Sequence, residues 1–206
     1  MKSSFSILFV AATFALLSNC GSNKQGDSTE IHDGHTDSQM HSSSASADAN
    51  GSKPAFAADA EFQEQLASVF TAYVALKDAL VSSNVNKVSA EAVATKQSLA
   101  KTDMKLLSGA AHNDWMNYLG AMEASLKEME NSADIESQRI AFSILSDNLY
   151  KSIKAYGLGG ATAYYEFCPM ALNNKGGFWL SREEEIRNPY FGEKMMTCGE
   201  VRETLH

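Results

Sequence analysis

The 206-residue chain has few cysteines and few prolines, and its charge is of the wrong sign for nucleic acid. Three cysteines are too few for the disulfide framework of a small secreted scaffold, and no Cys-x-x-Cys redox pair is present. Seventeen Lys and Arg against 25 Asp and Glu leave a net charge of -8 without a basic stripe, which argues against a nucleic acid partner. The sequence also lacks a Ser-His-Asp pattern, a phosphate-binding loop and paired catalytic carboxylates. We therefore do not expect an enzyme.

The N-terminal residues have the pattern of an export signal. Lys2 precedes an apolar run from Ile7 to Leu17, which is too short for a permanent membrane-spanning helix. Residues 1–19 are therefore predicted to be a signal peptide of the lipoprotein type. Cys20 directly follows, in a context that resembles the bacterial lipoprotein box, so we expect Cys20 to carry lipid. The alternative is ordinary cleavage that leaves Cys20 as a stray thiol. Either way, the protein should be exported, and a lipid would anchor it in the periplasm or at the outer membrane.

Residues 20–55 are rich in Ser, Asp and His and have few large apolar side chains. Such a composition cannot bury enough surface to fold, so this segment is predicted to be a disordered tether. Three of the five histidines lie here, at His32, His35 and His41, with Met40 beside the last. Short tracts of this kind can capture metal ions weakly, and polar filler is the other interpretation.

Residues 56–206 are predicted to form one helical domain. Apolar residues recur at steps of three and four in four segments, which is typical of amphipathic helices. The clearest stripe comprises Phe62, Leu66, Val69, Tyr73, Leu76 and Leu80. We expect helices over about 59–82, 86–106, 110–130 and 134–156. Short links favour antiparallel neighbours, so the predicted class is all-α, an up-down four-helix bundle.

The C-terminal tail is expected to be rich in loops. Residues 161–167 and 178–181 are rich in aromatic residues and are separated by an Asn-Asn-Lys-Gly-Gly turn, which predicts a short hairpin. Residues 193–205 are predicted to form a final short helix. On such a helix Met195 and Cys198 would lie on one face, because residues three apart are neighbours.

The tail also holds the residues with the most distinctive chemistry. Cys168 lies close to Met170, and Cys198 lies close to Met195, so four sulfur donors occupy two short segments. Thiolates and thioethers are soft ligands that suit Cu(I), and likewise Ag(I), better than Mg²⁺ or Ca²⁺. His112, at the expected start of the third helix, is a possible fifth ligand if the tail packs against that end of the bundle. The alternative is a Cys168–Cys198 disulfide that staples the tail.

Several stretches of the tail resemble a known family. They are Tyr165-Glu166-Phe167-Cys168-Pro169-Met170-Ala171, Trp179-Leu180-Ser181, Ile186-Arg187-Asn188-Pro189-Tyr190-Phe191-Gly192 and Met195 to Gly199. The family is a bacterial exported domain of unknown function, found alone or fused to the C-terminus of periplasmic adaptor subunits of heavy-metal efflux pumps. The resemblance covers roughly residues 60–205. It implies copper or silver handling and an efflux adaptor as a partner.

Two functions of different classes remain open at this point. The first is an exported module that captures Cu(I) or Ag(I) for an efflux or metal-homeostasis system. The second is a structural or interaction domain, stapled by a disulfide and without a metal role. The geometry of Cys168 and Cys198 should discriminate between them.

Overall fold

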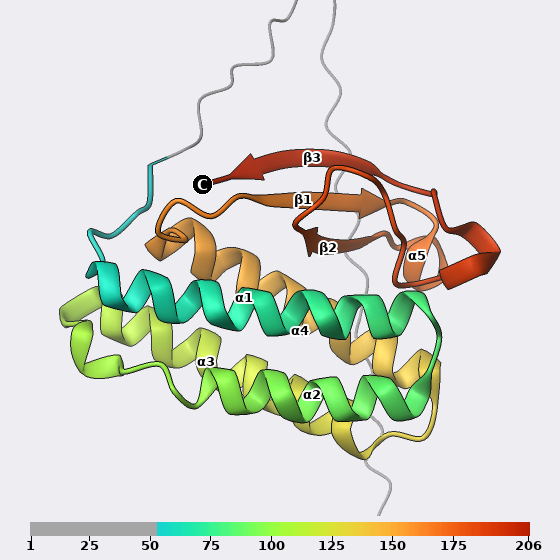
Figure 1. Cartoon of the computed structure of the whole chain (residues 1–206), viewed down its shortest axis with the longest axis horizontal. Helices are drawn as coiled ribbons and strands as arrows, with labels where there is room; N and C mark the ends of the chain where they lie inside the picture. The colour runs from blue at the N-terminus through green and yellow to red at the C-terminus, as the bar shows by residue number, and fades with distance from the viewer. Residues whose placement is uncertain (1–52) are drawn as a thin grey trace, which may run out of the picture. The chain divides into compact units, whose positions relative to one another are not determined.

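The computed structural model describes residues 53–206, and its larger part is helical (Figure 1). Four long helices follow one another along the chain: α1 (Ala60–Val81), α2 (Val85–Leu99), α3 (Gly109–Asn131) and α4 (Ile135–Tyr156). The predicted four-helix arrangement is thus confirmed. The second helix ends at Leu99, earlier than expected, and Met104–Leu106 form a separate 3-10 turn, η1. The predicted signal peptide, Cys20 and the three tether histidines lie outside the described residues.

Short polar links set the ends of these helices. The side chains of Asp59, Asn84 and Asp134 accept hydrogen bonds from backbone N–H groups in the first turns of α1, α2 and α4. Such caps satisfy donors that the helix itself leaves unpaired. Gly157 ends α4 with a φ of 79°, a conformation that glycine adopts without a steric penalty. Between residues 53 and 206, no helix is long and apolar enough to cross a membrane.

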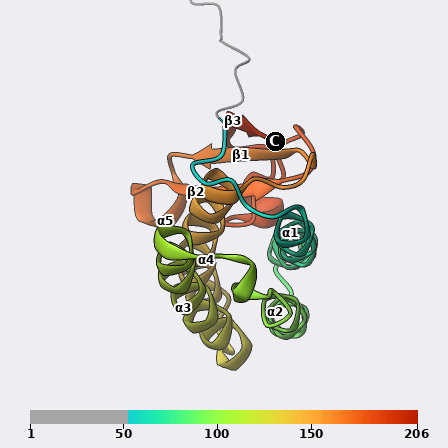
Figure 2. The same ribbon diagram turned by 90° about the vertical axis from the view of Figure 1, so that its left-hand side faces the viewer.

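The apolar stripes expected from the sequence form the core. All six residues of the α1 stripe are buried, and from α4 the core receives Phe142, Leu145, Leu149 and Ile153. Figure 2 shows the sheet on one side of the helices, with α1 and α4 nearest to it and α2 and α3 farther away. The helices therefore make their own core and also provide the surface on which the tail packs.

The tail forms a three-stranded antiparallel sheet in the order β2-β1-β3. Its strands are β1 (Ala163–Cys168), β2 (Gly177–Ser181) and β3 (Glu200–Leu205); between them lie the short α5 (Ala171–Asn174) and the 3-10 turn η2 (Gly192–Met195). The predicted hairpin is confirmed as the β1–β2 pair, in which Glu166 pairs with Trp179. A hydrogen-bond relay joins sheet and helices: the Leu180 N–H donates to the Tyr73 hydroxyl, which donates to Ser146.

The predicted final helix over 193–205 is wrong, and the all-α class is corrected accordingly. Residues Glu200–Leu205 are strand β3, antiparallel to β1 with a bulge between Tyr165 and Glu166. The physical reason lies in β1. With β2 on one side only, its other edge would leave backbone N–H and C=O groups without partners. A third strand satisfies them, and the structure is mostly helical with a sheet instead of a loop-rich tail.

Candidate metal centre

The neighbouring strands β1 and β3 bring Cys168 and Cys198 together across a sequence separation of 30 residues. Cys168 is the last residue of β1 and is completely buried, whereas Cys198 lies two residues before β3 and is half-buried. Both are free thiols. The Cys198 side chain hydrogen-bonds with Cys168, and this contact, together with burial, raises the pKa of Cys198 to about 11. Cys198 therefore keeps its proton at neutral pH until something replaces it.

Close approach of the chain beside Cys198 depends on Gly199. A Cβ at this position would lie 2.8 Å from Trp179 Cη2 and 3.0 Å from the Phe167 carbonyl oxygen. Its φ of +145° is also a conformation that side chains with a Cβ rarely adopt. Gly199 thus lets the turn before β3 lie directly on Trp179 and on the end of β1.

Asn188 fixes the turn that carries Cys198. Its buried side chain donates from Nδ2 to the Cys198 carbonyl (2.7 Å) and accepts the Tyr190 N–H at Oδ1 (2.8 Å). Its backbone N–H donates to the Met196 carbonyl (2.8 Å). Sequence analysis gave Asn188 no role, although an Asn before Pro is a common turn signal whose side chain bonds to nearby backbone.

The two methionines occupy different positions around this pair. The Cys198 N–H donates to the Met195 carbonyl (3.1 Å), so Met195 and Cys198 do share one turn, which follows the 3-10 turn η2 and is not the predicted final helix. Met195 is half-buried. Met170 lies two residues after Cys168, at the start of α5, and is 47% exposed. One methionine therefore lies in the turn of Cys198, and the other lies at the surface just after the end of β1.

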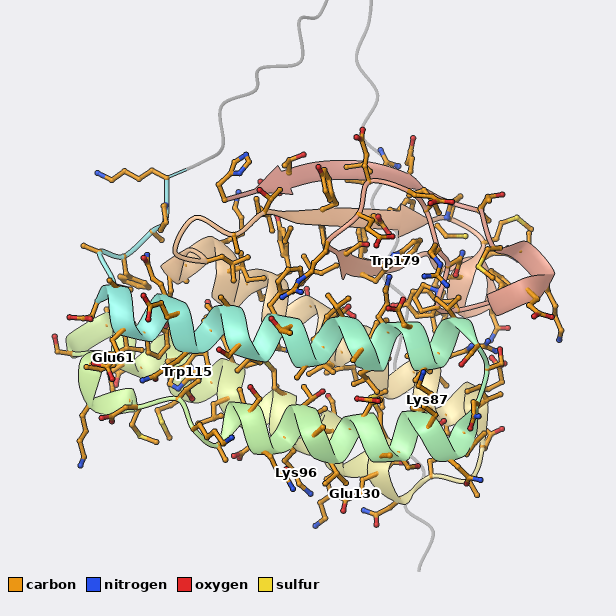
Figure 3. The ribbon with its side chains drawn as sticks, in the orientation of Figure 1. Glu61, Lys87, Lys96, Trp115, Glu130 and Trp179 are labelled. Carbon is orange, nitrogen blue, oxygen red and sulfur yellow. The ribbon has the colours of Figure 1, made fainter. Side chains whose placement is uncertain are left out.

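The structure does not bring His112 to the cysteines. His112 lies in the first turn of α3, one turn before Trp115, whose ring packs 5.0 Å from Phe62 at the start of α1. The loop of Cys198 packs at the other end of α1, where a Cβ on Gly192 would lie 2.6 Å from the Val81 carbonyl oxygen. Phe62 and Val81 are nineteen helical steps apart, which corresponds to about 28 Å along the helix. Figure 3 shows Trp115 near the start of α1, beside Glu61, and Trp179 toward the opposite end.

Glu166 is a second residue that the sequence did not single out. It lies two residues before Cys168 on the inner side of β1, is fully buried, and neither carboxylate oxygen has a hydrogen-bond partner. Burial raises the pKa of Glu166 to about 8, while buried Lys77 and the facing Trp179 indole hold it lower than burial alone would. An inward-pointing Glu in an otherwise apolar strand was the available signal.

Among the described residues, the candidate metal ligands that lie together are sulfur atoms. From residue 53 onward, no group of three or more His, Cys, Asp or Glu side chains is arranged to hold a metal ion. The candidate site consists of two adjacent thiols, with a methionine two or three residues from each along the chain. Such donors fit a soft monovalent cation, which accepts low coordination numbers, better than Zn²⁺, which takes four N, O or thiolate ligands.

Comparison with known proteins finds a family to which the helical part of the chain is similar. Residues 69–160 match the family described as "Protein of unknown function (DUF3347)". The DUF3347 match runs from within α1 to just beyond α4 and ends before β1. It supports a domain of unknown function and does not extend to the tail motifs that carry the family resemblance. No curated protein and no solved structure matches the chain.

Proposed function

We propose that this protein captures Cu(I) or Ag(I) at the thiols of Cys168 and Cys198, with Met195 as a supporting donor. The observation that carries the proposal is the contact between two free thiols at the seam between β1 and the turn before β3. Two sulfurs on adjacent chain segments can bind one soft cation together, and thiolate sulfur prefers such cations over Mg²⁺ or Ca²⁺.

The protonation of Cys198 supports an exchange of the metal ion for a proton. Thiolate, not thiol, is the metal ligand, and Cys198 is protonated at neutral pH because its pKa is about 11. Binding of the cation releases this proton to solvent, and the charge of the bound ion takes its place. The site therefore suits capture of a cation that binds thiolate strongly.

The same contact also favours the second candidate, a structural disulfide. Two thiols close enough to hydrogen-bond need little movement to form a bond, and the closed loop would span about 30 residues. A bridge of this size stabilises a fold by about 2–4 kcal/mol. In this role the sulfurs would staple β3 to β1, and the methionines would contribute only packing.

Cu(I) titration of the full chain tests the two candidates. The Cys20→Ser background removes the third thiol and leaves the tether histidines as a constant. Under anaerobic, reducing conditions, competition with bicinchoninate should show one tight Cu(I) site, which Cys168→Ser abolishes. Cys198→Ser, at a half-buried position, should do the same and serves as the second variant if buried Cys168 proves essential for folding.

Circular dichroism and melting temperature separate the outcomes. Both serine variants should remain helical, because the helices have their own core. If they bind Cu(I) as the parent chain does, and oxidation of the parent raises its melting temperature while leaving the variants unchanged, the cysteines are a staple and the metal function is wrong.

The cellular setting is part of the same proposal. A lipid on Cys20 would hold the domain at a membrane of an exported compartment, where it could pass the ion to a heavy-metal efflux adaptor. The support is the position of Cys20 directly after the apolar run and the family resemblance of the tail.

A further inference from the structure

The four sulfur donors differ sharply in their access to solvent. Cys168 is fully buried, Cys198 and Met195 are half-buried, and the Met170 side chain is 47% exposed. Of these four, Met170 is therefore the donor that a cation held by another molecule can reach first.

Met170 borders a hollow of about 420 Å³ on the surface. The lining includes apolar and polar side chains, among them Leu172, Tyr190, Phe191, Arg139 and Asn173. This volume accommodates a small chelating ligand, or a side chain that brings a cation. A thioether at the edge of such a hollow is placed to take over a soft ion from that carrier.

Tyr190 connects this hollow to the buried thiol. Tyr190 is one of the residues that line the hollow, and a Cβ on Gly177 would lie 2.7 Å from Tyr190 Cε2. Gly177 is the residue that pairs with Cys168 in the β1–β2 register. The Tyr190 hydroxyl donates to the Phe178 carbonyl (2.6 Å), which holds the ring in place. Tyr190 therefore lies both at the hollow that Met170 borders and beside the strand pair that carries Cys168.

The segment after Met170 is held in an uncommon conformation. Leu172, Asn173 and Asn174 have φ values of 54°, 59° and 62°, the left-handed region that costs energy for residues with a Cβ. Backbone bonds from the Asn174 N–H to the Met170 carbonyl (3.3 Å) and from the Gly176 N–H to the Ala171 carbonyl (3.1 Å) close this turn. The backbone that carries Met170 is thus fixed at the rim of the hollow.

We propose that Met170 is the exchange ligand of the site: it takes the soft cation from a carrier in the hollow and passes it to Cys198 and Cys168. This rests on the proposed metal function. In the first step a bond forms between the cation and Met170 Sδ while one bond to the carrier breaks. In the second step, bonds to the sulfurs of Cys198 and Cys168 replace the bond to Met170 Sδ and the remaining carrier bonds, and the thiol protons pass to solvent. The cation keeps its charge throughout, so no oxidant or reductant is needed.

The test is the rate of transfer from a bulky carrier. The full chain with Cys20→Ser is mixed anaerobically with the Cu(I)–bicinchoninate complex, and loss of the complex's absorbance is followed by stopped flow. Met170→Leu should slow transfer about tenfold. It should change the equilibrium Kd by less than about threefold, because an exchange ligand speeds uptake and release alike and Kd depends only on the ratio of these two rates. Met116→Leu is the matched control, since Met116 lies on α3 and is 42% exposed. This variant should take up Cu(I) at the parent rate.

The outcomes separate this inference from the function beneath it. The inference is overturned if Met170→Leu takes up Cu(I) at the parent rate while Cys168→Ser still abolishes uptake. The proposed metal function is unaffected by that result. An unchanged rate with a Kd weakened about tenfold makes Met170 an ordinary ligand and also overturns it. If Cys168→Ser takes up Cu(I) as the parent does, both the function and the inference fail.

Discussion

At the scale of single residues, the most unusual group is the carboxyl of Glu166. A buried carboxylate without hydrogen bonds is costly, and such a group responds by taking up a proton more readily. The nearby Lys77 ammonium offsets part of this cost, but Lys77 also forms an ion pair with Asp78 (3.0 Å). Glu166 therefore lowers the stability of the fold at the pH at which it must ionise.

Glu166→Gln should remove this pH dependence. Its pKa is raised from 4.5 to about 8, so the stabilisation from the neutral carboxyl is complete below pH 4.5 and is lost as pH rises through about 8. Relative to the parent, the free energy of unfolding of Glu166→Gln should be about 1–3 kcal/mol higher at pH 8.5 and nearly equal near pH 4.5. Urea unfolding at the two pH values measures it, with exposed Glu123→Gln as the control. Parallel pH profiles for parent and variant would contradict the argument.

At the scale of elements, the helices could be predicted and the last strand could not. The stripe from Phe62 to Leu80 repeats over five turns, and a pattern of that length has one structural solution. Residues Glu200–Leu205 are too few for the spacing of their apolar residues to distinguish a helix from a strand. They form a strand because they pair with the open edge of β1, which is a tertiary feature. The approach of Cys198 to Cys168 was expected from the residues, but it arises from strand pairing and not from a helix. Glu166 and Asn188 were missed because their roles exist only once the sheet has formed.

Gly199→Ala tests how the turn before β3 builds the site. The added methyl would lie 2.8 Å from Trp179 and 3.0 Å from a backbone oxygen, at a φ of +145°. We expect a loss of about 1–3 kcal/mol in the free energy of unfolding and weaker Cu(I) binding, because Cys198 must move with the turn. Gly120→Ala is the matched control. Gly120 lies in α3 with open space around it, so alanine should add about 0.5–1 kcal/mol. Equal effects of the two substitutions would show that Gly199 has no special role.

At the scale of the whole molecule, the helices form a base on which the last 45 residues assemble the sulfur site. Arg139 of α4 joins the two parts: its Nε–H donates to the Pro189 carbonyl (3.0 Å), and its Nη2 donates to Ser83 Oγ (2.9 Å) after α1. The proposed site therefore depends on the helices as well as on the sheet, although its sulfur residues come from two short segments. The family match to the helices and the resemblance carried by the tail concern two parts of one folded unit.

The predicted attachment of the chain to a membrane depends on Cys20. If Cys20 carries lipid, the wild-type protein should sediment with membranes, and Cys20→Ser should appear in the soluble fraction, because removing the lipid removes the apolar surface that binds the bilayer. The measurement is cell fractionation followed by immunoblotting, with mass spectrometry of the mature N-terminus. Cys198→Ser is the matched control, since it removes a thiol and keeps Cys20, and it should stay with membranes. A Cys20→Ser protein that remains in the membrane fraction, or a wild-type protein that is soluble, would exclude lipid anchoring and leave Cys20 as an ordinary thiol.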